Sequence, residues 1–246
     1  MKQRLDQLLV KRQLVPSRHQ AQALIELGKV KLNGRVVIKP STQVGSDDHV
    51  ELLKSDRWVS RGGHKLTSVI EQLGITFDHK IVLDVGASTG GFTQVALARG
   101  ASKIYAVDVG TDQLDPSLRA DPRVVSMEKT DIRSVDSFPD MVDVVVIDVS
   151  FISLRLVLAH LATLIPPQTD VLALVKPQFE TGGNKTLLHK GVVKNDTMRR
   201  EILKEFEIWA KTQGWQVKGK ADSELAGAKG NRERFYLLRS IQRKPR

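Results

Sequence analysis

Four ionisable residues stand at the ends of predicted apolar strands, and their types suit proton transfer or the binding of a polar ligand. They are Asp84, Asp108, Asp148 and Lys176. Charged groups at the tips of apolar strands are costly unless they are paired or used. Since the carboxyl ends of parallel strands meet at one rim, where α/β proteins bind ligands, these four residues predict a site. The alternative is a salt-bridge network with no chemical role.

A glycine-rich turn leads to this rim. Ile81–Val85 is an apolar run typical of a buried strand, the turn contains Gly86, Gly90 and Gly91, and Phe92–Arg99 has the character of a helix. Small residues before a helix N-terminus let the backbone approach a nucleotide-sized ligand. The spacing Gly-x-x-x-Gly-Gly differs from that of dinucleotide sites. A second strand ends at Asp108, which is placed to accept both hydroxyls of a ribose. The adenosyl end of S-adenosylmethionine fits this arrangement, although such turns also serve purely structural connections.

The composition excludes several classes of protein. The 246 residues include no cysteine, so disulfides, thiolate metal sites and cysteine nucleophiles are excluded. The six histidines show no metal-ligand spacing. No apolar run approaches the roughly 20 residues that cross a bilayer, and the first residues lack the apolar core of a secretory signal. We therefore expect a cytoplasmic protein without a metal, of a length that suits one large domain and a small one.

Positive charge is concentrated near the N-terminus. The formal net charge is +10, and residues 1–39 contain nine Lys or Arg against Asp6 and Glu26 alone. Neutralisation of phosphates supplies much of the affinity of proteins for nucleic acids, so this asymmetry favours a polyanionic partner. The alternatives are a solvated face or attraction to anionic lipid.

The first 59 residues form a predicted unit of their own. Leu5, Leu8 and Leu9 share one helical face, and a capping box at Ser17 begins a second helix that ends at Gly28. Asn33-Gly34 lies between two short apolar runs, which predicts a β-hairpin, and a third strand follows over residues 50–53. The junction covers residues 56–60, where Trp58 is expected to pack between domains or, alternatively, to stack on a base.

This segment resembles the S-four-type RNA-binding module. The resemblance rests on Arg4-Leu-Asp-Gln-Leu-Leu, Ser17-Arg18, Ala21, Leu24-Ile-Glu-Leu-Gly28, Val30, Asn33-Gly34 and Lys39-Pro-Ser41. In that family the second helix and the hairpin face structured RNA. The resemblance implies RNA-binding roles for six residues: Arg4, Arg18, Lys29, Lys31, Arg35 and Lys39.

Residues 60–246 alternate between predicted strands and helices. This pattern predicts a mostly parallel, doubly wound sheet covered on both faces. The glycine turn is preceded by a helix over 67–73. It is followed by strands over 124–127, 141–147 and 171–175, helices over 154–164 and from 195 or 196 to 214, a loop over 178–195, and last strands over 215–219 and 234–238.

Five segments of this half resemble the TlyA-type methyltransferases of the FtsJ-like group of ribose 2′-O-methyltransferases. They are Ser60-Arg-Gly-Gly-His-Lys-Leu66, Asp84-Val-Gly-Ala-Ser-Thr-Gly-Gly-Phe-Thr93, Asp148-Val-Ser-Phe-Ile-Ser-Leu154, Leu174-Val-Lys-Pro-Gln-Phe-Glu180 and Asn231-Arg-Glu-Arg-Phe235. Together with the N-terminal module, the resemblance covers nearly the whole chain in the same order. It implies a Rossmann-like methyltransferase domain that uses S-adenosylmethionine.

The resemblance also implies a catalytic tetrad of Lys65, Asp148, Lys176 and Glu233. A ribose 2′-hydroxyl is a weak acid, and a lysine kept neutral by burial and a neighbouring cation can remove its proton near neutral pH. Lys176 is the expected base, Lys65 and Asp148 are expected to orient the hydroxyl, and Glu233 to position a lysine. The cofactor residues carried over are Asp84, Gly86, Ser88, Gly90, Gly91, Asp108 and Asp131. Phe151 is expected either in the target pocket or in the core.

The function that the family implies is 2′-O-methylation of a cytidine in 23S ribosomal RNA and, in some members, also in 16S RNA. The expected partner is therefore ribosomal RNA or a ribosomal subunit. Two alternatives from other classes remain. Some family members are labelled haemolysin, which raises a cytolytic, membrane-active protein, and the fold could serve a non-catalytic RNA-binding protein.

Overall fold

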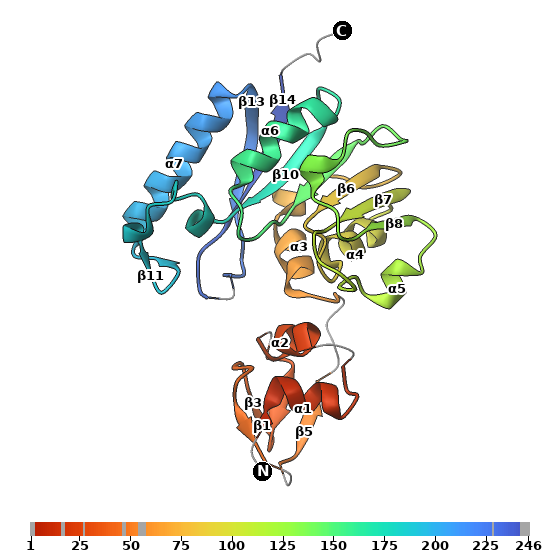
Figure 1. Cartoon of the computed structure of the whole chain (residues 1–246), viewed down its shortest axis with the longest axis vertical. Helices are drawn as coiled ribbons and strands as arrows, with labels where there is room; N and C mark the ends of the chain where they lie inside the picture. The colour runs from red at the N-terminus through yellow and green to blue at the C-terminus, as the bar shows by residue number, and fades with distance from the viewer. Residues whose placement is uncertain are drawn as a thin grey trace. The chain divides into compact units, whose positions relative to one another are not determined.

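The chain divides into two compact units, residues 1–61 and 62–246, in a computed structural model (Figure 1). The structure describes residues 3–15, 18–26, 28–45, 48–53, 58–227 and 229–241. The expected cap at Ser17 and the expected junction residues 56 and 57 lie outside the described residues. Trp58 is buried, with 7% of its surface exposed.

The first unit consists of two helices and short strands. Its helices are α1 (Leu5–Lys11) and α2 (Arg18–Glu26), and its strands are β1 (Gln3–Arg4), β2 (Val30–Leu32), β3 (Arg35–Val36), β4 (Gln43–Val44) and β5 (Val50–Leu52). The hairpin predicted at Asn33-Gly34 is confirmed, because both residues have positive φ (50° and 79°) and connect β2 to β3. β5 pairs with the other edge of β2. The short β1–β4 pairing was not predicted.

The core of this unit contains one buried carboxylate. Leu5, Leu8 and Leu9 are nearly fully buried, as predicted, and Asp6 beside them is 0% exposed. Asp6 accepts two hydrogen bonds of 2.9 Å from Arg4, one of 3.2 Å from Arg18 and one of 2.8 Å from Gln22. The bonds from Arg4 in particular hold the pKa of Asp6 well below its usual range. Asp6 thus joins α1 to α2.

The second unit contains a seven-stranded sheet in the order β13-β14-β10-β9-β6-β7-β8. Its strands are β6 (Ile81–Val85), β7 (Lys103–Val107), β8 (Val124–Met127), β9 (Val144–Ile147), β10 (Asp170–Val175), β13 (Trp215–Asp222) and β14 (Arg234–Ser240). Neighbours from β8 to β10 are parallel, whereas β14 is antiparallel to β10 and to β13. The mostly parallel, doubly wound fold is therefore confirmed. The chain adds β7 and β8 on one side of β6 and then β9 on its other side, so the strand order switches between β6 and β9. Sheets of this kind bind ligands at such a switch point.

Helices cover both faces of this sheet. They are α3 (Arg61–Leu73), α4 (Gly91–Ala98), α5 (Pro116–Arg119), α6 (Leu154–Leu164) and α7 (Asp196–Thr212). One core cluster contains alternate strand residues, such as Leu83 and Val145, together with apolar residues of α6 and α7. The intervening strand residues point the other way, where Phe92 of α4 meets Phe235 of β14 at a ring-centroid distance of 6.0 Å. Figure 1 shows α7 alongside β13.

Several bounds differ from the sequence-based prediction, among them those of β13 and β14, which extend to Asp222 and Ser240 rather than to residues 219 and 238. α3 begins at Arg61 rather than at residue 67, because burial of Gly63, Lys65 and Leu66 outweighs the low helix propensity of two glycines. β9 begins at Val144 rather than Met141, which is 72% exposed. The expected loop over 178–195 contains a short hairpin of β11 (Leu188–His189) and β12 (Val192–Val193), as well as the 3-10 turns η2 (Pro177–Phe179) and η3 (Lys185–Leu187).

Candidate functional site

The ionisable residues predicted at strand ends lie at one rim of the sheet. Asp108, Asp148 and Lys176 each directly follow a parallel strand, namely β7, β9 and β10. Asp84 is the last residue but one of β6, which pairs with both β7 and β9. The structure therefore brings together the four residues whose positions first indicated a site.

Two lysine–carboxylate pairs form at this rim. Lys65 Nζ of α3 lies 2.5 Å from Glu233 Oε2, which directly precedes β14. Lys176 Nζ lies 2.6 Å from Asp148 Oδ1 and donates a 2.7 Å hydrogen bond to Ser150 Oγ. All four residues of the predicted tetrad are thus in ion pairs, although they come from four separate segments of the chain.

Asp148 is the electrostatic link between the two pairs. Burial opposes its ionisation, but the positive charges of Lys176 and Lys65 outweigh this effect and lower its pKa below the usual value. The lysine side chains are each 9% exposed and that of Glu233 is 2% exposed. Buried ion pairs add little net stability because desolvation offsets their attraction. Two adjacent ion pairs at the rim where such sheets bind ligands are therefore better explained by a role in a reaction than by a contribution to the stability of the fold.

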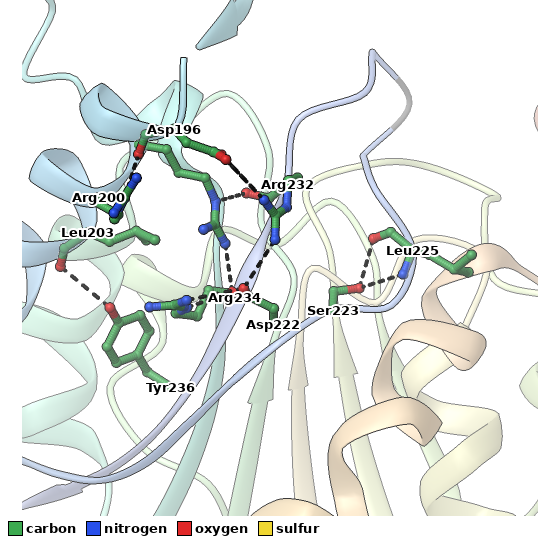
Figure 2. A network of polar contacts seen from close by, with 10 residues as sticks. Asp196, Arg200, Leu203, Asp222, Ser223, Leu225, Arg232, Arg234 and Tyr236 are labelled. Atoms are coloured by element: carbon green, nitrogen blue, oxygen red, sulfur yellow. Dashed lines mark hydrogen bonds and ion pairs between the residues drawn. The ribbon is translucent and has the colours of Figure 1, made fainter. Parts of the chain in front are cut away.

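The segment that carries Glu233 is held by a network centred on Asp222 of β13. Figure 2 shows Arg232 and Arg234 converging on this carboxylate, at 3.7 Å and 2.6 Å respectively. The buried Arg199 of α7 binds Asp222 at 2.6 Å and also donates to the carbonyl oxygen of Arg232. Despite burial, the arginines lower the pKa of Asp222 to about 2, so it stays ionised and anchors both sides of Glu233.

Asn231 and Gly227 complete this support. The Asn231 side chain, 4% exposed, accepts from the Val193 amide and donates to the Gly191 carbonyl oxygen, so it attaches the segment to the β11–β12 hairpin. A Cβ on Gly227 would lie 2.4 Å from Glu233 Oε1. The carboxylate therefore has its present position only because residue 227 has no side chain.

Glu180 joins the two segments that carry Asp148 and Lys176. It is 3% exposed, and its carboxylate accepts hydrogen bonds from the Leu154 amide (2.6 Å) and from Ser153 Oγ (2.8 Å) at the N-terminus of α6. Burial raises its pKa, an effect that these bonds partly offset. A carboxylate is favourable at a helix N-terminus, where amide groups are otherwise unpaired.

Glu180→Ala is expected to lower the free energy of unfolding by about 3 kcal/mol, because two buried donors lose their acceptor. Glu180→Gln should lower it by less than half as much, since an amide can still accept from Leu154 and donate to the Ser153 hydroxyl. Denaturant titration of both variants measures the difference. Equal losses would show that the charge, rather than the hydrogen bonds, holds these segments together.

The glycine turn has the backbone that a close-packed ligand site requires. Gly86 (φ 83°) and Gly90 (φ 92°) are left-handed, and a Cβ on Gly86 would lie 2.7 Å from the carbonyl oxygen of Asp148. Ser88 is also left-handed (φ 49°), and its amide donates to Asp108 Oδ2 at 2.8 Å. Asp108 Oδ1 accepts from the amide of Gly110, so one carboxylate oxygen is bonded to the glycine turn and the other to the loop after β7. Gly91 begins α4.

Asp84 has one buried oxygen without a hydrogen-bond partner among the described residues. It is 0% exposed, and Oδ2 accepts a 2.6 Å hydrogen bond from Thr93, whereas Oδ1 has no partner there. Burial raises its pKa to about 7, the hydrogen bonds from Thr93 partly oppose this, and the charges of Asp148 and Asp108 add to it. An oriented acceptor of this kind suits a cationic group of a ligand.

Two further predicted site residues lie at the edges of the rim. Asp131 accepts from the backbone and the guanidinium group of Arg133, the latter chiefly lowering its pKa, while the neighbouring Thr130 amide donates to the Asp108 carbonyl oxygen. Phe151 is 93% exposed and left-handed (φ 66°), and its ring centroid lies 5.5 Å from that of Phe179. The core alternative for Phe151 is therefore wrong.

The six predicted RNA-binding residues divide into two groups. Arg4 and Arg18 hold the buried Asp6, with 37% and 53% of their side chains exposed. Lys31 of β2, Arg35 of β3 and Lys39 lie on or beside the hairpin, and Arg35 and Lys39 are exposed. Lys29, which is half-buried, directly precedes β2.

Sequence reasoning missed several supporting residues. Ser150 and Glu180 lie inside motifs that were singled out, so their position relative to Asp148 and Lys176 could have suggested a role. Asn231 likewise begins a motif that was singled out. Arg199 and Asp222 pair across 23 residues of sequence, and nothing in their local pattern indicates it. Among the described residues, no group of three or more His, Asp or Glu is arranged to hold a metal ion.

Comparison with known proteins gives consistent matches over both units. The model of the FtsJ-like methyltransferase family matches residues 58–240, and that of the S4 domain matches residues 3–50. The chain is 43% identical over 241 residues to the 16S/23S rRNA (cytidine-2′-O)-methyltransferase TlyA of Mycobacterium tuberculosis, covering 96% of this chain and 90% of that protein. It is 36% identical to Hemolysin A of Brachyspira hyodysenteriae, covering 97% and 99%. A solved structure from Streptococcus thermophilus, which carries a hemolysin name, superposes with a TM-score of 0.78 at 37% identity, covering 99% and 90%.

Proposed function

The chain belongs to the FtsJ-like methyltransferase family, and from this premise we propose that it methylates the ribose 2′-oxygen of a cytidine in ribosomal RNA, with S-adenosylmethionine as donor. The observation that carries the proposal is the pair of buried lysine–carboxylate contacts, Lys65–Glu233 and Lys176–Asp148, at the rim beside the glycine turn. The relative from Mycobacterium tuberculosis is named for this reaction. An RNA-binding S4 domain and a methyltransferase domain in one chain fit an RNA substrate.

The residues of the turn fit the proposed cofactor. The unpartnered Asp84 Oδ1 can accept a cationic group, and the left-handed Gly86 and Gly90 leave room where side chains would intrude. Asp108 can accept ribose hydroxyls through its remaining lone pairs, and Asp131 is the proposed neighbour of the adenine. When bound, S-adenosylmethionine supplies an electrophilic methyl group. Ser88 and Gly91 contribute backbone to the same turn.

The tetrad supplies the proton transfer. In its neutral form Lys176 Nζ accepts the proton of the 2′-hydroxyl, and Asp148 stabilises the ammonium that results. Lys65, fixed by Glu233, places a second cation where negative charge develops on the ribose oxygen. Ser150 keeps the Lys176 ammonium aligned with its carboxylate. We propose that the exposed Phe151 lies beside the base of the target nucleotide.

The affinity for S-adenosylmethionine is expected to rise about tenfold between pH 6 and pH 8. Asp84, with its pKa raised to about 7 by burial, is mostly protonated at the lower pH and ionised at the higher one, and only the ionised form attracts a cationic ligand. Calorimetric titration across this range measures the slope. Asp84→Asn should bind weakly with no dependence on pH over this range, and a variant that keeps the slope would remove Asp84 from the cofactor site.

The hairpin of the S4 domain is expected to contribute two phosphate contacts. The double substitution Lys31→Gln and Arg35→Gln should lower the slope of log affinity for RNA against log salt by about 1.4, at roughly 0.7 per contact. These positions are preferred to Arg4 and Arg18, whose loss would leave the buried Asp6 without its two cationic partners. Lys204→Gln with Lys218→Gln removes the same charge from the other unit and serves as control. A salt slope equal to that of the control would place the hairpin outside the interface.

No specific observation favours the alternative that the chain is a cytolytic, membrane-active protein. No described helix is both long and apolar enough to cross a bilayer. The hemolysin name belongs to the relative from Brachyspira hyodysenteriae and to the solved structure from Streptococcus thermophilus, whereas the relative from Mycobacterium tuberculosis is named for ribosomal RNA methylation. Liposome leakage caused by the purified protein, without any methyl transfer, would reverse this preference. The intact tetrad likewise disfavours a non-catalytic RNA-binding protein.

The decisive experiment is incubation of the full chain with radiolabelled S-adenosylmethionine and separate ribosomal subunits, followed by mapping of the modified nucleotide. The expected product carries the label on a cytidine 2′-oxygen, which resists alkaline cleavage of the following phosphodiester bond. Label on a base, or no label on either subunit or on naked RNA, would contradict the proposed function.

A further inference from the structure

The strand order leaves one side of the rim for the RNA chain. The proposed cofactor residues follow β6 and β7, whereas the tetrad residues Lys176 and Glu233 flank β10 and β14, on the other side of β9. An RNA that presents a ribose to the tetrad must extend away from the cofactor. This inference rests on the proposed function, and it directs the flanking nucleotides over the β10–β14 side, toward α7 and the β11–β12 hairpin.

A hollow of about 280 Å³ lies on that side. Its lining includes Pro177, Val193, Asn195, Asn231 and Arg232. Pro177 directly follows Lys176 and Arg232 directly precedes Glu233, so the hollow adjoins both ion pairs of the tetrad. Asn231 is fixed by its hydrogen bonds to the β11–β12 hairpin, so this part of the lining is held in place.

Three exposed lysines belong to the chain segments that bound this hollow, although they are not among its lining residues. Lys190 forms the hairpin turn with Gly191, Lys229 Nζ lies 3.2 Å from the point where a Cβ of Gly191 would stand, and Lys194 follows β12. None of these three lysines has an ion-pair partner among the residues that the structure describes. Arg232 is paired with Asp196 at 3.3 Å, and both side chains are 59% exposed.

A second basic hollow offers a contrast. It lies along α7 and β13 and is lined by Lys204, Lys211 and Lys220, among others. Glu207 pairs with Lys211 at 3.2 Å and with Lys220 at 3.0 Å, so much of this positive charge is neutralised within the protein. Arg234, which directly follows Glu233, also lines this second hollow, so adjacency to the tetrad does not separate the two. The first hollow is favoured by charge, because three exposed lysines in its neighbouring segments have no ion-pair partner among the described residues.

We propose that the hollow between the β11–β12 hairpin, the start of α7 and residues 229–232 binds the sugar–phosphate backbone of the RNA next to the target nucleotide. The three lysines without an ion-pair partner among the described residues supply the cations that phosphates require. Because the hollow adjoins Lys176 and Glu233, a phosphate held there lies next to the target nucleotide. The contact is independent of sequence and contributes to the affinity for RNA.

The triple variant Lys190→Gln, Lys194→Gln and Lys229→Gln of the full chain tests this proposal against Lys204→Gln, Lys211→Gln and Lys218→Gln, which removes equal charge elsewhere on the same unit. With ribosomal RNA as probe, the first variant is expected to raise KM for RNA on the order of 30-fold at moderate salt and to lower the salt slope of RNA binding by about 2, at roughly 0.7 per contact. Its kcat and its affinity for S-adenosylmethionine should match those of the unmodified chain.

Equal salt slopes for the two triple variants would overturn the proposal, as would a fall in kcat without any change in KM. Tighter binding of an acidic peptide than of RNA at this hollow would also overturn it. The unmodified chain is assayed for methyl transfer in parallel. If it transfers no methyl group, the proposed function fails, whereas the difference between the two salt slopes still decides whether this hollow binds RNA.

Discussion

Replacement of Lys176 by alanine is expected to lower the rate of methyl transfer on the order of 10³-fold, within the range that a positioned general base contributes. Lys176 Nζ is the atom proposed to take the proton of the 2′-hydroxyl, and it is held by Asp148 and Ser150 at 2.6 Å and 2.7 Å. Binding of S-adenosylmethionine and of RNA should change little, because the side chain is proposed to act in proton transfer and its polar contacts go to Asp148 and Ser150.

Two further variants separate the base from its surroundings. Lys176→Ala leaves Asp148 without its nearest cation, so the carboxylate itself could cause part of the loss. Lys176→Ala combined with Asp148→Asn removes that charge and should remain inactive. Ser150→Ala, which removes only one hydrogen-bond partner of Lys176, should lose no more than about tenfold. Single-turnover assays with saturating RNA measure the chemical step. Activity of Lys176→Ala near that of the unmodified chain would refute its assignment as the base.

The glycine-turn side of the candidate site could be predicted in detail from local sequence. Ile81–Val85 is a strand with the predicted bounds because its residues, Asp84 apart, are apolar, and Gly86 and Gly90 occupy left-handed positions. Strand-end residues Asp108, Asp148 and Lys176 converge because parallel strands share a rim. These inferences needed only neighbours in the sequence and the general geometry of parallel sheets.

The other half of the site depends on contacts that no local pattern records. Lys65 and Glu233 are 168 residues apart, and their pairing requires α3 to begin at Arg61 and β14 to enter the sheet antiparallel to β10. Only the family resemblance indicated that these two residues belong together. Asp222 escaped prediction for the same reason, since a carboxylate in a strand is taken for a surface residue until the arginines that surround it are known.

Gly86→Ala is expected to weaken binding of S-adenosylmethionine by on the order of 10²-fold and to reduce methyl transfer at least as much, since displacement of reacting groups by about 1 Å can cost this factor. A Cβ at residue 86 would lie 2.7 Å from the carbonyl oxygen of Asp148 and 3.3 Å from Cα of Val149. Both are backbone atoms, which cannot rotate away as a side chain can. Either the glycine turn or the segment that carries Asp148 must move.

Gly74→Ala is the matched control. Gly74 is also left-handed (φ 65°), but a Cβ there would meet nothing within 4 Å. The control therefore carries only the strain of a left-handed alanine, roughly 1–2 kcal/mol, and should keep its cofactor affinity and its activity. Calorimetry gives the affinities, and thermal unfolding confirms that both variants fold. If Gly86→Ala binds S-adenosylmethionine as well as Gly74→Ala does, the close approach of residue 86 to Asp148 does not matter for cofactor binding. The contact between Gly86 and Asp148 then does not couple the donor site to the tetrad. If only Gly86→Ala loses affinity, the absence of one side chain allows the cofactor turn and the catalytic carboxylate to share the same rim.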